Sequence, residues 1–290
     1  MVNGMSMGES TLPAEAAPGA VRLVVADLDR TTEFYERTLG IEPLERSTEI
    51  VRLGAGDGAL VELVHDPGAP ARPQGTTGLF HLAILVPDRP ALAATLRRVA
   101  GAGWRFTGAS DHLVSEALYL RDPEGNGIEI YRDRPREDWP RANGTIQMDS
   151  LPLDLEDLLT EPEPAQAERM PPQTRMGHVH LNVSDLAASE GFYTGLLGFD
   201  VTVRGYPGAL FLSAGGYHHH VGLNTWGGEG APQPPPGARG LRWFELVLPS
   251  GSALHETAAR LEQGGFVPQP QDAGVLVSDP AGNGILLRVA

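Results

Sequence analysis

The feature that most constrains this chain is a long internal repeat. Residues 20–41, AVRLVVADLDRTTEFYERTLGI, return without a gap as residues 178–199, HVHLNVSDLAASEGFYTGLLGF. Each copy is typical of a strand, an Asp helix cap and an amphipathic helix that ends at a glycine. A second match lies near the end of each half, where DPEGNGI at residues 122–128 returns as DPAGNGI at residues 279–285. A match bounded at both ends indicates a tandem duplication, so the fold must be built from two equivalent halves.

Each half divides again into two units in which a strand, a helix and further strands follow one another. In the first half a strand at 79–86 precedes an amphipathic helix at 89–100, and in the second a strand at 241–248 precedes a helix at 252–264. We therefore predict an α+β fold of four βαβββ modules, at residues 20–68, 77–133, 175–226 and 239–290, which form two curved mixed sheets. Residues 1–19 are expected to be a flexible leader, and residues 134–174 a linker with one short helix.

Composition limits the function and the chemistry of any site. The net charge of −15 and the pI near 5.0 argue against a nucleic-acid partner, which a basic face would bind. The chain has no cysteine, so a transition-metal site must use histidine and carboxylate ligands. No stretch reaches the length of a membrane span and the N-terminus lacks a signal-peptide pattern. We expect a cytoplasmic protein with a small-molecule substrate, as a monomer or a homo-oligomer.

The four-module arrangement resembles the vicinal oxygen chelate superfamily, whose members pair βαβββ units around a metal. Residues 110–129, SDHLVSEALYLRDPEGNGIE, are similar to the signature of the extradiol ring-cleaving dioxygenases, with His112, Tyr119 and Glu129 at matching separations. The two-half layout is closest to bacterial catechol 2,3-dioxygenases of the smaller tandem type. The resemblance implies an enzyme that cleaves a catechol-type ring with O2.

The duplication also separates scaffold from chemistry. The turn at residues 122–127 recurs in the second half, so we assign it to the scaffold. Three residues do not recur: Glu129, His178 and His81 are matched by Leu286, Ala20 and Trp243. Strand alternation turns these three away from the apolar neighbours that face the helices, toward the concave side of a sheet. They are therefore the candidates for a site.

The pairing of the modules decides whether these candidates meet. If modules paired in chain order, neither cavity would collect a good set of metal ligands. If module 2 pairs with module 3 and module 1 with module 4, the candidates fall together, and we predict this arrangement. One cavity then collects His81, Glu129, His178 and His220, and the other collects Ala20, Glu62, Trp243 and Leu286.

Two histidines and one carboxylate on one face form the facial triad expected of non-heme Fe(II) oxygenases. We predict His81, His178 and Glu129 as the ligands and Fe(II) as the metal, with Mn(II), Ni(II) and Zn(II) as alternatives. The resemblance implies that His220 is the acid/base histidine, that Tyr119 bonds a substrate oxygen and that His112 lies behind the ligands.

The remaining histidines and two tryptophans have weaker assignments. His180 and His218 are further candidates for the cavity lining. Surface or loop positions are expected for His65, His219 and His255, and packing against the linker and a loop for Trp139 and Trp226.

Two other functions fit the same residues. With His220 as a fourth ligand the site would suit Ni(II) or Zn(II), as in glyoxalase I, and would isomerise a hemithioacetal. A protein that sequesters a ligand without metal chemistry, as the bleomycin-resistance members do, is the non-enzymatic alternative. His112 and Tyr119 favour the dioxygenase.

Overall fold

The structure of the chain is a computed structural model that describes residues 11–290. Residues 1–10, the first part of the predicted leader, lie outside the described residues. The rest of that segment is more ordered than expected, because strand β1 (Ala17–Val25) already begins at Ala17 and Leu12 is buried. The backbone N–H of Leu12 donates to the carbonyl of Gly198, 3.2 Å away, which ties this segment to module 3.

The first two modules follow the predicted order. Module 1 consists of β1, α1 (Leu28–Glu33), the π-helical turn η1 (Phe34–Thr38), β2 (Glu42–Arg46), β3 (Ile50–Ala55) and β4 (Gly58–His65). Module 2 consists of β5 (Gly78–Leu85), α2 (Arg89–Gly101), β6 (Phe106–Asp111), β7 (Ser115–Arg121) and β8 (Gly127–Asp133).

The linker contains the short helix that we expected, α3 (Leu155–Leu158), together with η2 (Arg136–Asp138), β9 (Arg141–Ala142), β10 (Thr145–Ile146) and β11 (Leu151–Pro152). Module 3 consists of β12 (Arg175–Asn182), α4 (Leu186–Glu190), η3 (Gly191–Leu197), β13 (Asp200–Val203), β14 (Ala209–Ser213) and β15 (Val221–Asn224). Module 4 consists of β16 (Gly240–Leu248), α5 (Gly251–Gln263), β17 (Gln269–Gln271), β18 (Gly274–Ser278) and β19 (Gly284–Val289). Within residues 11–290, no helix has the length and apolarity to span a bilayer.

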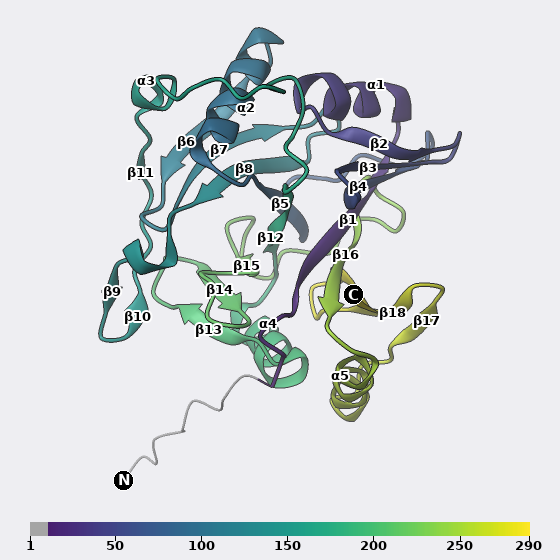
Figure 1. The fold of residues 1–290 in the computed structure, drawn as a ribbon. Coiled ribbons are helices and arrows are strands. Elements are labelled where there is room, and N and C mark those ends of the chain that lie inside the picture. Colours follow the sequence, from purple (N-terminus) through teal and green to yellow (C-terminus); the bar gives the residue numbers. More distant parts are fainter. Residues whose placement is uncertain (1–10) are drawn as a thin grey trace.

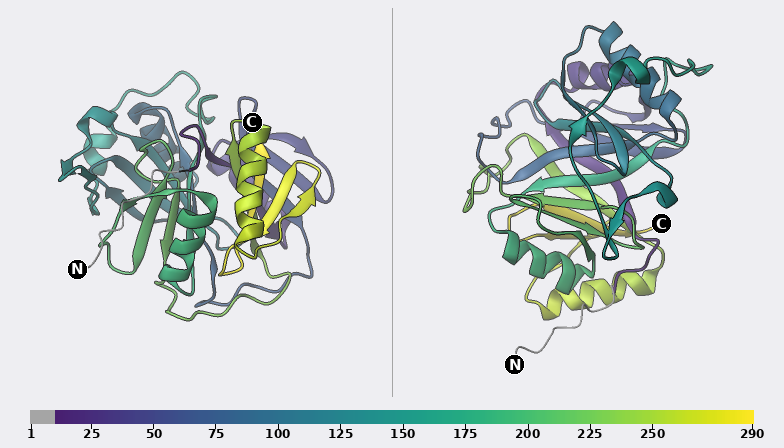
Figure 2. Two further views of the ribbon diagram at one scale, coloured as in Figure 1. Left: turned by 90° about the horizontal axis from the view of Figure 1, so that it is seen from below. Right: turned by 90° about the vertical axis from the view of Figure 1, so that its left-hand side faces the viewer.

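Two sheets confirm the predicted pairing of the modules. The larger has the strand order β11-β6-β7-β8-β5-β12-β15-β14-β13, and the smaller β17-β18-β19-β16-β1-β4-β3-β2. Antiparallel pairing of β5 with β12 joins modules 2 and 3, and that of β1 with β16 joins modules 1 and 4. The helices of modules 1 and 2 lie at one end of the molecule and those of modules 3 and 4 at the other, with the sheets between them (Figures 1 and 2). Each sheet therefore takes one module from each half of the chain.

The recurring turn is scaffold for a physical reason. The carboxylate of Asp122 accepts backbone N–H bonds from Glu124 and Asn126, a side-chain bond from Asn126 at 2.8 Å, and the hydroxyl of Tyr35 at 3.4 Å. Asp279 makes the equivalent bonds in module 4, and Tyr193 donates to it at 3.1 Å. Each turn thereby fixes itself and holds the helix of the preceding module, which connects the two modules of one half.

Both central strand pairs contain a bulge at equivalent positions. His180 pairs with His81 and Leu181 with Leu79, so Phe80 is the extra residue. In the smaller sheet Arg242 is the extra residue in the same way. A Cβ atom on Gly127 would collide with the carbonyl oxygen of Phe80, and one on Gly284 would collide with that of Arg242, which explains why this glycine recurs. Because of the bulge, Phe80 joins His81 at the concave face instead of pointing away from it.

Candidate metal centre

Three predicted ligands come from three neighbouring strands of the larger sheet. Glu129 lies on β8, His81 on β5 and His178 on β12, in the sheet order β8-β5-β12. All three side chains are buried, and their exposed fractions are 3%, 6% and 1%. The sheet therefore brings together residues that are separated by almost 100 positions in the sequence.

The three donor atoms converge on one point. His81 Nε2 lies 3.0 Å from Glu129 Oε2, His178 Nε2 lies 3.1 Å from the same oxygen, and the two nitrogens are 3.2 Å apart. Among the described residues this is a set of His and Glu groups close enough to hold a metal ion. Three lone-pair donors at the corners of a small triangle cannot all satisfy one another by hydrogen bonds. A cation at the common point satisfies all three, so the residues fit a metal ion with two nitrogens and one oxygen.

The electrostatics leave Glu129 and His178 in the state that binds metal. Burial alone would raise the pKa of Glu129, but the neighbouring His178 and His81 outweigh it and hold that pKa well below its usual value. Burial lowers the pKa of His178 to about 4. Near neutral pH the site therefore offers an ionised carboxylate and a neutral His178 imidazole, which ligation requires.

Tyr119 and His112 lie together beside this centre, as predicted. Tyr119 pairs with Glu129 across strands β7 and β8. The Nδ1 of His112 lies 2.7 Å from the carbonyl oxygen of Asp149, and its Nε2 lies 2.6 Å from the hydroxyl of Tyr119. A carbonyl can only accept, so Nδ1 carries the proton, Nε2 accepts, and Tyr119 donates to His112. The oxygen of Tyr119 is then left with lone pairs for a further donor.

The prediction that His220 enters this cavity is wrong, and His219, which lies in a loop as expected, is buried and not at the surface. Strand β15 begins only at Val221, so residues 218–220 form a bend in which side chains do not alternate. His220 stacks on Tyr217, with ring centroids 4.9 Å apart, and lines a separate pocket with Arg136 and Arg175. His219 instead lines the metal cavity, and its ring centroid lies 4.0 Å from that of His178. His220 is therefore not a fourth ligand of this centre.

A hydrogen-bond chain sets the tautomer of His219. The carboxylate of Asp133 accepts from the hydroxyl of Tyr217 and lies 2.9 Å from Nε2 of His218, which must donate to it. In a neutral His218, Nδ1 then accepts, and the Nδ1 of His219, 2.8 Å away, carries the shared proton. This assignment leaves the Nε2 of His219 unprotonated. Burial holds the pKa of His219 well below its usual value, which keeps this nitrogen free.

The cavity around the centre has a volume of about 310 Å³. His180 lines it, as expected, and so do residues that the sequence did not assign to it. Phe80 reaches it because of the bulge in β5, and Trp226, which is 47% exposed, packs on Phe80 and His180 at 5.2 and 5.3 Å between ring centroids. The linker also contributes to the wall, through Met148, Asp149 and Ser150. The tendency of aromatic side chains to cluster was the available signal for Phe80 and Trp226.

The smaller sheet has its own cavity, which contains Glu62, Trp243 and Leu286, as predicted. Ala20 is buried in β1, where its N–H donates to Glu245. Glu62 pairs in register with Arg22, whereas His180, at the place of Arg22, pairs with Gly222. The counterpart of Glu62 is therefore Gly222. His65 and His255 are exposed, and Trp139 is buried against Tyr217 and His218, as expected.

Comparisons with known proteins agree with this architecture. The family model of the Glyoxalase/Bleomycin resistance protein/Dioxygenase superfamily matches residues 17–130 and 175–287. The chain is 42% identical over 267 residues to the catechol-2,3-dioxygenase of Bacillus subtilis (strain 168), which covers 90% of this chain and 93% of that protein. It is 31% identical over 121 residues to the lactoylglutathione lyase of Haemophilus influenzae, which covers 39% of this chain and 89% of that protein. The crystal structure of glyoxalase I from Zea mays has the same fold, with a TM-score of 0.57 at 19% identity over 94% of this chain and 92% of that one.

Proposed function

This chain belongs to the Glyoxalase/Bleomycin resistance protein/Dioxygenase superfamily, and on that premise we propose that it is an extradiol dioxygenase that opens a catechol-type ring with O2. One observation carries the proposal. His81, His178 and Glu129 converge within 3.2 Å of one another in a buried cavity, beside the His112–Tyr119 pair. The name of the Bacillus subtilis relative supports the same reaction, at an identity that covers most of both chains.

His81, His178 and Glu129 would hold the metal, which we propose to be Fe(II), with Mn(II) as the nearest alternative. When bound, Fe(II) would supply a Lewis acid and a redox partner for O2. Tyr119, His180 and His219 line the same cavity as the three ligands. The catechol and O2 would therefore meet in a space from which these side chains exclude bulk water.

Two groups of the cavity would manage the protons of the catechol. Burial and the charge of Glu129 raise the pKa of Tyr119 well above its usual value, so its hydroxyl stays protonated and bonded to His112. Its oxygen would accept a hydrogen bond from a substrate hydroxyl and orient the ring. The unprotonated Nε2 of His219 would take a proton from a catechol hydroxyl and return it later, as a general base and acid. We therefore transfer to His219 the role that the resemblance implied for His220.

Anaerobic loading with Fe(II), followed by catechol and air, tests the proposed function. We expect the yellow colour of a ring-fission product from the loaded protein and none from Glu129→Ala treated in the same way. The absence of colour with several catechols, together with turnover of methylglyoxal and glutathione, would contradict the dioxygenase assignment. The geometry does not favour that isomerase, because His220 is outside the cavity and cannot serve as the fourth ligand.

A further inference from the structure

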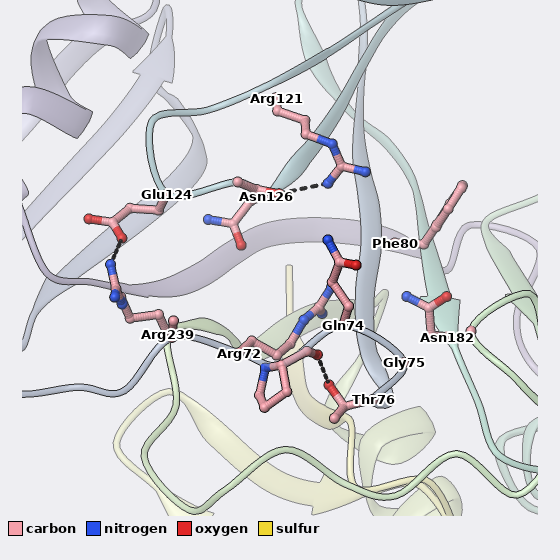
Figure 3. A pocket seen from close by; sticks show the side chains of 14 residues that line it. Arg72, Gln74, Gly75, Thr76, Phe80, Arg121, Glu124, Asn126, Asn182 and Arg239 are labelled. Carbon is pink, nitrogen blue, oxygen red and sulfur yellow. Dashed lines mark hydrogen bonds and ion pairs between the residues drawn. The ribbon is translucent and has the colours of Figure 1, made fainter.

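A second cavity, of about 490 Å³, lies next to the metal cavity, and neither the proposed reaction nor the repeat explains it. Its wall comes from the loop at residues 71–76, the turn between β7 and β8, and the loop before β16. Its charged lining residues are Arg72, Arg121, Arg239 and Glu124. Figure 3 shows Glu124 and Arg239 on one side of this arginine pocket and Phe80 on the other, with Arg72, Gln74 and Arg121 between them.

The charges in the arginine pocket do not cancel. Glu124 is fully used, because one oxygen pairs with Arg239 at 2.7 Å and the other accepts backbone N–H bonds from Ala26 and Asp27. Arg121 donates to the carbonyl of Gly125 at 2.8 Å, which neutralises no charge. Within residues 11–290, the buried Nη1 of Arg72 has no hydrogen-bond partner. Two guanidinium groups thus face this space without a carboxylate, in a chain whose net charge is −15.

This arrangement costs free energy unless an anion occupies the pocket. Burial lowers the pKa of Arg72, and the charge of Arg121 lowers it further, so the two cations repel each other across the space. An unpartnered guanidinium donor in a buried position also loses its hydrogen bonds to water. A carboxylate between the two arginines would screen the repulsion, and guanidinium groups fit carboxylates in a planar, two-bonded geometry.

The arginine pocket is adjacent to the metal cavity along Phe80. Phe80 lines both spaces and also a small pocket of about 60 Å³. That small pocket shares His81, Thr107 and Tyr119 with the lining of the metal cavity, and Arg121 with the lining of the arginine pocket. A short substituent on a ring beside the metal ligands could therefore extend past Phe80 toward Arg121.

We propose that Arg72 and Arg121 bind a carboxylate, and that the substrate is a catechol whose ring carries a short side chain ending in that carboxylate. This inference rests on the proposed dioxygenase function for the position of the ring, and it adds the class of substrate. The metal cavity holds the diol, Phe80 borders the side chain, and the arginine pocket selects for the negative charge.

A matched pair of ligands tests the inference by binding alone. 3,4-Dihydroxyphenylacetate and its amide have the same ring and nearly the same shape, and differ in the charge at the end of the side chain. Anaerobic titration calorimetry of the whole protein should show at least about tenfold tighter binding of the acid than of the amide, as expected for charge-assisted hydrogen bonds. Arg72→Gln should reduce this preference to about threefold or less. The control Arg30→Gln, an exposed site on α1 outside these cavities, should retain it.

Equal binding of the acid and the amide by the unaltered protein would overturn the inference, as would a full preference in Arg72→Gln. If circular dichroism shows that Arg72→Gln is unfolded, Arg121→Gln, at an exposed position, is judged by the same criterion. Acetate carries the charge without the ring, so acetate that binds as tightly as the acid would indicate a site for free anions and overturn the substrate assignment. Ring cleavage of unsubstituted catechol is measured separately. If it is absent while the preference for the acid persists, the proposed function fails and the arginine pocket stands.

Discussion

The two concave sheets of this molecule have the same strand order around their centres, yet within residues 11–290 only the larger gathers a cluster of His and Glu groups that could hold a metal ion. Where the larger sheet pairs His81 with His180, the smaller pairs Trp243 with Arg22. The guanidinium of Arg22 lies 4.6 Å from the ring centroid of Trp243 and forms an ion pair with Glu62. Arg22 thus occupies the place of an imidazole and has its charge neutralised by Glu62. The side chains, and not the shared backbone arrangement, therefore determine which cavity can hold a metal ion.

The two sheets also differ at the strand next to this pair, where the larger has Gly222 on β15 and the smaller has Glu62 on β4. A Cβ atom on Gly222 would lie 2.9 Å from the ring of His180, so the larger sheet needs a residue without a side chain there. The smaller sheet has Glu62 at that position, which reaches Arg22. In the larger sheet the absence of a side chain at Gly222 leaves space beside His180. In the smaller sheet the ion pair of Glu62 with Arg22 fills the equivalent space. The following predictions test how far this contrast extends.

Removal of the carboxylate should have the largest effect. Glu129→Ala leaves two imidazoles without a carboxylate, and we expect its affinity for Fe(II) to fall by at least about 100-fold while its circular dichroism spectrum is unchanged. Leu286→Ala changes the equivalent position of the smaller sheet and should keep a full complement of metal, as measured by elemental analysis of the loaded proteins. A loaded Glu129→Ala protein that retains stoichiometric iron would refute the ligand assignment.

The second largest effect should be a difference in kcat between variants of the adjacent residues His219 and His220. His219→Gln removes the proposed base, and we expect kcat for ring cleavage to fall by about 10² to 10⁴ with its iron content intact. His220→Gln acts outside the metal cavity and should change kcat by less than about threefold. Steady-state rates with catechol, at equal iron content, compare the two variants. An equal loss of kcat in both variants would show that His220 takes part in catalysis.

The three proposed metal ligands were predictable because each lies within a predicted strand, although bulges adjoin His81 and His178. His81, His178 and Glu129 each alternate with apolar neighbours, and none of them recurs in the other half, so parity and the repeat agreed. The pairing of the modules followed from the same residues. That these three residues bind a metal is a proposal, which the sequence pattern and the distances between their donor atoms support.

The errors occurred where alternation stops. His220 was placed in the cavity by extending β15 backward, but the bend at residues 218–220 exchanges it with His219. The position of Phe80 in the cavity wall could not be predicted, because a bulge leaves no mark in a short apolar run. The linker residues of the wall, such as Asp149, could not be predicted either, since their position depends on pairing of β11 with β6 far along the chain. Local periodicity carries no information about such events.

Acid should weaken the larger sheet first. Burial lowers the pKa of His178 to about 4 and that of His220 to about 3, and it lowers those of His180 and His219 too. Below about pH 6.5 the unfolded chain therefore binds protons that the folded chain does not, so stability is lost as the pH falls toward 4. His178 alone would account for about 3 kcal/mol over that interval.

Hydrogen exchange of the metal-free protein at pH 7 and pH 5 measures this difference. Protection factors, which correct for the slower intrinsic exchange at pH 5, should fall more in β5, β12 and β15 than in β1 and β16, because the histidines of modules 1 and 4, His65 and His255, are exposed. Burial raises the pKa of Asp122 to about 6 and also raises that of Asp279. These two aspartates stabilise the folded chain in acid, but one lies in each sheet, so they do not produce the contrast. An equal fall of the protection factors in the two sheets would show that the buried histidines do not control the response.

The duplicated turn should give the smallest contrast. Asp122→Asn and Asp279→Asn each weaken the bonds to two backbone N–H groups and to a buried tyrosine, and we expect a loss of about 1–3 kcal/mol in the free energy of unfolding from each. Urea unfolding of both variants should agree within about 0.5 kcal/mol. A loss confined to Asp122→Asn would mean that this turn serves the metal cavity and is more than scaffold.

Because modules from different halves pair with each other, the arrangement affects how such a protein can evolve. Since each sheet needs one module from each half, either half alone would have to find a second copy to complete a sheet. The covalent connection replaces that encounter with a high effective concentration, which does not depend on the amount of protein in the cell. Fusion also frees the two sheets from being identical. One can keep its metal ligands while the other accumulates an arginine, a tryptophan and a leucine without loss of the chemistry.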